Sequence, residues 1–155
     1  MGFKTAAFIG AGLFITSVGC ANAMTIRGGE WEVTMKMGAG DASPIVRKFC
    51  YASDMPVTPE YLEQAMSKMA ADCSKPDVQI SGNTMQVGLV CKIQQMTLTS
   101  KSTMTFEGDS AYHTDSQTHT DNAMKGMPAD MTMSQDGKRL GPCQPGDKQA
   151  PGFGK

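Results

Sequence analysis

The chain has 155 residues, and its 14 Lys and Arg against 15 Asp and Glu give a formal net charge of −1. This balance excludes the strongly basic surface by which nucleic acids and acidic membranes are bound. The first 23 residues have the composition of an export signal, so 132 residues (155 − 23) remain, which is the length of one domain and excludes a multidomain protein.

The N-terminal residues predict export. Lys4 supplies a positive charge, Thr5 to Gly19 is an apolar stretch, and Ala21-Asn22-Ala23 is a small-x-small cleavage site. We expect cleavage after Ala23, a periplasmic location and no transmembrane helix afterwards, because the stretch is shorter than the roughly 18 residues of a membrane span. The alternative is a lipoprotein anchored through Cys20, since the sequence Ser-Val-Gly-Cys at 17–20 is similar to a lipid-attachment box.

Strand patterns follow along the rest of the chain. Glu30 to Met37 alternates strictly between apolar and polar residues, and Ile45 to Tyr51 resumes the pattern. Further strands are predicted over 78–81, 84–93, 96–107, 111–120 and 131–133, the last of these before a turn at Asp136-Gly137. About seven short strands predict a mainly β fold, an antiparallel meander that is either open or closed into a barrel.

The apolar faces of these strands form the expected core: Trp31, Val33, Met35, Met85, Val87, Leu89, Leu98, Met104 and Phe106. The chain is poor in branched aliphatic residues, with only four Leu, four Ile and six Val after residue 23, whereas it has 14 Met in all. We therefore expect methionine, a flexible apolar side chain, to replace them in the core.

One helix is predicted, over about residues 59–72. Thr58 is a good N-cap, Pro59 suits the first helical position, and Glu60 is favourable near the positive helix end. One buried stripe with helical spacing follows, formed by Leu62, Ala65, Met66, Met69 and Ala70. We expect this helix to pack against the sheet.

Four cysteines follow the signal: Cys50, Cys73, Cys91 and Cys143. An even number in a small exported chain predicts two disulfides, and no Cys-x-x-Cys spacing indicates a zinc or redox site. A two-residue Gly82-Asn83 turn would place Cys73 opposite Lys92, one residue from Cys91, and a bulge near Pro76 would correct the difference. Of the three pairings, this favours Cys73–Cys91 with Cys50–Cys143, so 24–143 is the expected domain.

The position of His113 depends on the turn after residue 107. A two-residue turn would place His113 opposite Met104, whereas a three-residue turn would pair Tyr112 with Phe106 and turn His113 outward. We prefer the aromatic pair and therefore expect His113 in solvent. Residues 144–155, with three Gly and two Pro, are predicted to be a disordered tail.

Several motifs, in order, are similar to those of one bacterial exported family, domain of unknown function 3617. They are Arg27-Gly28-Gly29-Glu30-Trp31-Glu32-Val33-Thr34, Cys50, Thr58-Pro59-Glu60, Asp72-Cys73, Ser81-Gly82-Asn83, Cys91 and Gly141-x-Cys143. The chain departs from the family pattern at Gly28, where Pro is common, and in the longer step from Tyr51 to Val57. The resemblance implies a cell-envelope location and a β-rich fold, and it implies no activity.

No catalytic motif is present in the sequence, and no catalytic or cofactor-binding residue is expected. The chain is expected to be a non-enzymatic binding or structural envelope protein, whose methionine-lined face contacts a hydrophobic ligand or an envelope protein. Copper(I) binding by Met124, Met127, Met131 and Met133 is the alternative, because thioethers are soft ligands. The second alternative is a hydrolase-like enzyme that uses the carboxylates of Asp109, Asp115 and Asp121.

Overall fold

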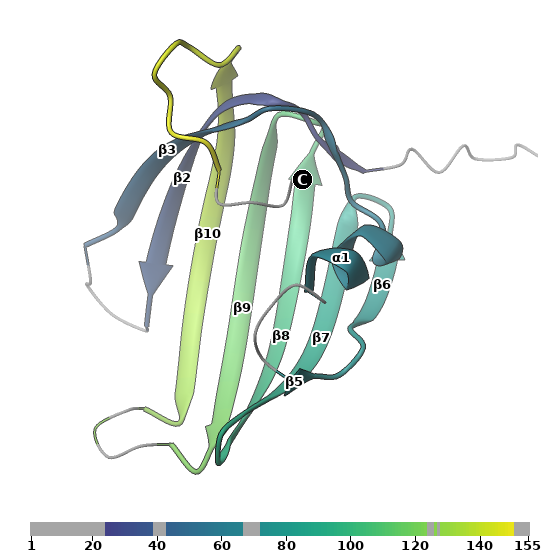
Figure 1. Ribbon diagram of the computed structural model, residues 1–155, viewed down its shortest axis with the longest axis vertical. Helices are drawn as coiled ribbons and strands as arrows, with labels where there is room; N and C mark the ends of the chain where they lie inside the picture. Colours follow the sequence, from purple (N-terminus) through teal and green to yellow (C-terminus); the bar gives the residue numbers. More distant parts are fainter. Residues whose placement is uncertain (1–23, 39–42, 67–71, 124–125, 127, 151–155) are drawn as a thin grey trace, which may run out of the picture.

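The protein is seen here in a computed structural model that describes residues 24–38, 43–66, 72–123, 126 and 128–150. Its main element is an antiparallel sheet of eight strands with the order β3-β2-β10-β9-β8-β7-β5, and β6 pairs with the same edge of β7 as β5 does (Figure 1). The elements are β1 (Thr25–Ile26), β2 (Gly29–Met37), β3 (Ile45–Tyr51), β4 (Met55–Pro56), α1 (Pro59–Met66), β5 (Asp72–Cys73), β6 (Asp77–Ser81), β7 (Thr84–Ile93), β8 (Met96–Glu107), β9 (Ala111–Asp121) and β10 (Asp130–Gly141).

The predicted mainly β fold with one helix is confirmed, and the sheet is open rather than closed. Strands β6 to β10 form a meander in which each strand pairs with the next, and the hairpin of β2 and β3 then adds to β10. The short strands β1 and β4 pair with each other outside this sheet. Among the described residues, no helix is long and apolar enough to cross a membrane.

The core lies at one end of one face of the sheet, which we call the inner face. Its buried members are Met24, Trp31, Val57, Met85, Phe106 and Tyr112. Trp31 is only 1% exposed, donates its indole N–H to the carbonyl of Arg27 at 2.8 Å and stacks on Tyr112 at 5.6 Å. The helix α1 lies in front of the sheet near β7 (Figure 1), and Leu62 packs against the core from it.

The predicted core is only partly buried. Trp31, Val33, Met85 and Phe106 are buried, and Val87 and Met104 are half-buried against the core. Met35, Leu89 and Leu98 are half-buried as well, but they lie outside this cluster. Alternation places a residue on a face but does not say what covers it, and β1 and α1 bring Ile26 and Leu62 onto the end of the inner face that holds the core.

The turn predicted at Asp136-Gly137 is wrong, because β10 runs straight through both residues and pairs with β9 and β2 there. Gly137 lies opposite Tyr112, whose ring occupies the space that a side chain at position 137 would need. The glycine is used for close packing and not for a turn.

The helix ends earlier than predicted. Asp72, expected as the last helical residue, lies in β5, because Cys73 must be extended to lie opposite Cys91. Residues 67–71, including Met69 and Ala70 of the predicted stripe, lie outside the described residues. The start is as expected, with the Thr58 hydroxyl accepting the Tyr61 N–H at 3.2 Å.

The structure has two disulfides, Cys50–Cys143 and Cys73–Cys91, as the hairpin register predicted. Asp77 pairs with Gly88, whereas Cys73 pairs with Cys91 and not Lys92, so the register slips by one residue between β5 and β6. The chain is also not disordered over 144–150: the Cys50 N–H donates to Lys148 at 2.7 Å and Ala150 donates to Cys50 at 2.9 Å. The unpaired edge of β3 offers these hydrogen bonds, which a prediction from composition cannot include.

Candidate functional site

The inner face beyond the core is a regular grid of side chains. Across β8, β9, β10 and β2, one row consists of Ser102, Ser116, Met133 and Met37, each directly opposite the next. The following row consists of Ser100, Thr118 and Met131. Hydroxyls thus occupy β8 and β9 on one side of the site, and thioethers occupy β10 and β2 on the other.

These two rows form the floor of a groove of about 620 Å³, within the range of small-molecule sites. Large apolar side chains remain in contact with water beside it, since Met37 is 58% exposed and Met131 is 41% exposed. An exposed apolar surface of this shape can hold the apolar part of a small ligand.

The hydroxyls of the floor are paired with one another. Ser102 and Ser116 share a hydrogen bond of 2.8 Å, and Thr118 donates to Ser100 at 3.2 Å. Each of these bonds uses the O–H of one hydroxyl, so one O–H of each pair stays free, beside the apolar groups of the same side chains. Its hydroxyls therefore do not prevent apolar contact.

The same face of β9 carries two further threonines with buried hydroxyls, Thr114 and Thr120, which are 8% and 2% exposed. Neither hydroxyl has a hydrogen-bond partner. A buried polar atom without a partner costs about 1–3 kcal/mol. Valine, which has the same shape as threonine without the hydroxyl, would therefore be more favourable to stability at these two positions of β9.

Charge is scarce in the groove. Among its described lining residues, only Asp130 has an ionisable side chain, and this carboxylate is bonded to His119 at 2.7 Å. A ligand in the groove would therefore be held by apolar contact rather than by ion pairing.

The methionines proposed for copper are only partly placed. Met131 and Met133 line the groove, whereas Met124 and Met127 lie outside the described residues. Met37, which directly opposes Met133, is a thioether neighbour that the sequence analysis did not include in the set. Among the described residues, no cluster of three or more His, Cys, Asp or Glu has the geometry of a metal site.

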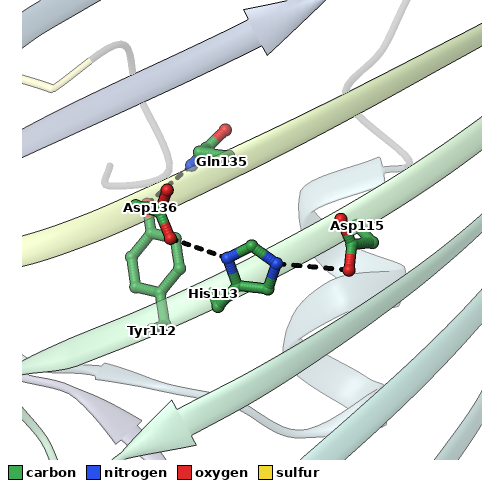
Figure 2. Close-up of polar contacts among 5 residues, drawn as sticks. All are labelled: Tyr112, His113, Asp115, Gln135 and Asp136. Carbon is green, nitrogen blue, oxygen red and sulfur yellow. Dashed lines mark hydrogen bonds and ion pairs between the residues drawn. The ribbon is translucent and has the colours of Figure 1, made fainter. Parts of the chain in front are cut away.

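The opposite face carries two histidines with paired carboxylates. Figure 2 shows His113 on β9 between Asp136, at 2.6 Å from Nδ1, and Asp115, at 3.2 Å from Nε2. The figure also shows Tyr112 of the inner face, whose hydroxyl accepts a hydrogen bond of 2.6 Å from Gln135. His119 lies similarly near Asp130 and Asp121, at 2.7 and 3.3 Å.

These carboxylates change the protonation of the histidines. The hydrogen bond to Asp136 is the main cause that raises the pKa of His113, and the bond to Asp130 does the same for the pKa of His119. Asp136 and Asp130 were missed in the sequence, because they come from β10 and only its pairing with β9 brings them close. The outward position of His113 is as predicted, with Phe106 opposite Tyr112.

The carboxylates proposed for hydrolysis are not brought together. Asp115 and Asp121 lie six residues apart on β9, which is roughly 20 Å in an extended strand. Asp109 pairs with Arg27 at 3.6 Å. Both ring nitrogens of His113 are bonded to carboxylates, so neither is placed to activate a nucleophile.

The fold and the groove define the chain as an open antiparallel β domain, fastened by two disulfides, with one partly uncovered face. It belongs to the DUF3617 family, described as a protein of unknown function, whose profile matches residues 26–143. Searches of curated proteins and of solved structures find no match. The resemblance inferred from the motifs is thereby confirmed, and the two disulfides are typical of an oxidising compartment outside the cytoplasm.

Proposed function

We propose that this protein is a non-enzymatic periplasmic protein that binds a hydrophobic ligand in the groove. One observation carries the proposal: Met37 and Met131 remain 58% and 41% exposed beside a hollow of about 620 Å³, although the chain has few aliphatic residues for its core. Exposed methionines adapt to ligands of different shape at little conformational cost. The periplasmic location is supported by the disulfides and by the signal-like sequence before residue 24.

The test compares two variants of β10. Met131→Gln makes the groove polar, and Leu140→Gln is the matched control, because Leu140 is 42% exposed on the same strand and does not line the groove. Binding of a neutral naphthylamine dye is followed by fluorescence. We expect Met131→Gln to weaken binding by roughly ten-fold, since a side chain of this size contributes about 1–2 kcal/mol when buried.

The control should bind the dye as the unaltered protein does. Equal losses in both variants, or no dye binding by the unaltered protein at micromolar concentrations, would refute the proposal. Comparison of the unfolding free energies of the two variants checks that a loss of binding is not a loss of fold.

Copper(I) binding is a second candidate, and the direct opposition of Met37 and Met133 favours it. Two thioethers on adjacent strands can approach one soft ion, and Met131 lies one row away. Titration of Cu(I) against a chromophoric chelator tests this function. Competition at micromolar affinity that Met133→Leu abolishes supports it, and the absence of competition removes it.

A further inference from the structure

We propose that the ligand of the groove is the single unbranched alkyl chain of a monomeric amphiphile, which lies across the strands with its headgroup in solvent. This inference rests on the proposed binding function and specifies its ligand. Three features of the site carry it: its dimensions, the pairing of its hydroxyls and the methionines on the side of its floor toward β2.

The floor is longer than it is wide. From Ser102 on β8 to Met37 on β2, the row crosses three strand spacings, which at about 4.8 Å each amount to roughly 14 Å. The second row lies two residues away along each strand, or roughly 7 Å. A single extended chain fits this outline when its long axis lies across the strands.

The floor is also too small for a protein partner. Its outline covers on the order of 100 Å², whereas a stable protein interface buries about 800 Å² on each partner. The volume of about 620 Å³ is that of a small-molecule site.

The chemistry of the floor favours an alkyl chain over a sugar or a peptide. Its four hydroxyls are paired, Ser102 with Ser116 and Thr118 with Ser100, so only one O–H of each pair is left to donate to a ligand, which is too few for the many polar groups of a sugar or a peptide. An alkyl chain makes no such demand. It leaves both hydrogen bonds in place and removes apolar surface of the methionines from water.

The side of the floor toward β2 is made of Met37, Met131 and Met133. Their unbranched side chains have several rotatable bonds and can follow a chain of varied length or curvature. Asp130, which has the one ionisable side chain among the described lining residues, is bonded to His119 on the other face. Because the carboxylate of Asp130 already has His119 as its partner, the headgroup of the ligand does not need a positive charge.

The experiment measures binding of n-alkyl maltosides with 8, 10, 12 and 14 carbons, held below micelle formation, by displacement of the naphthylamine dye from the whole protein. Each methylene laid on the floor should tighten binding roughly four-fold. The gain should stop at about a dozen carbons, the number of bonds that spans roughly 14 Å. Ser116→Phe, which fills the centre of the floor, should abolish binding, and Ser134→Phe on the opposite face is its matched control.

Several results would overturn the inference. A neutral steroid glycoside that displaces the dye while no maltoside does so would leave the binding function intact and refute the alkyl chain. The same holds if affinity does not change with chain length. Binding to phosphatidylcholine vesicles without binding of monomers would indicate a membrane surface, and a concentration-dependent dimer that loses dye binding would indicate a second copy of the chain as occupant. If the phenylalanine variants do not fold, the chain-length series still decides.

Discussion

Gly137→Ala tests whether the packing of Tyr112 on β10 stabilises the fold. A Cβ at position 137 would lie 2.8 Å from Cδ1 of Tyr112, and Cε1 and Cζ of the ring would be closer still. Ordinary contacts begin at 3.4 Å, so the ring must retreat by about 1 Å.

The ring has little room for such a movement. Tyr112 is 5% exposed, stacks on Trp31 at 5.6 Å and accepts a hydrogen bond from Gln135 at 2.6 Å. Overpacking of this kind destabilises by about 1–3 kcal/mol. With about 4 °C per kcal/mol for a domain of this size, we expect the Tm to fall by roughly 4–12 °C.

Urea and thermal unfolding followed by tryptophan fluorescence measure the effect, since Trp31 contacts the ring and is the chain's one tryptophan. Gly88→Ala is the control, because the nearest atom to its Cβ would be 3.8 Å away, on Asp77. In a double-mutant cycle, Tyr112→Leu should remove most of the effect of Gly137→Ala. A Gly137→Ala variant as stable as Gly88→Ala, or strict additivity with Tyr112→Leu, would refute the packing argument.

Three further predictions concern stability. Thr120→Val should raise the unfolding free energy by about 1 kcal/mol, because it removes a buried hydroxyl without a partner. Thr118→Val is the control and should not raise the unfolding free energy, because it removes the hydrogen bond to Ser100. Equal changes in urea unfolding would contradict the prediction. His113→Asn should have a lower free energy of unfolding than the unaltered protein below about pH 6.5, because the raised pKa of folded His113 makes its protonation stabilise the fold. The two free energies of unfolding should converge as the pH rises through that pKa. Urea-unfolding profiles that stay parallel from pH 5 to 9 would disprove the linkage. Replacing Cys50 and Cys143 by Ala should cost about 4–5 kcal/mol in calorimetry, because the bond closes a separation of 93 residues; a loss below 1 kcal/mol would contradict the entropic account.

Local pattern determined a large part of this protein. Strict alternation specified the face of each residue of β2, and the length of the turn after Glu107 decided between two registers of β9. The hairpin at Gly82 placed Cys73 within one residue of the position opposite Cys91, because positions across a two-residue turn have a constant sum, and a slip of one residue completes the pairing. These features depend on neighbours in the chain or on one tight turn.

The groove and its surroundings required the tertiary structure. Whether Met37 and Met131 would be core or surface depended on where other elements cover the sheet, and β1 and α1 pack Ile26 and Leu62 against the end that holds Trp31. The role of Gly137 depended in the same way on the ring of Tyr112, which arrives from another strand. The alternation of a strand records which side chains share a face, but burial is a property of what packs on that face, and that is decided by contacts between residues far apart in the chain.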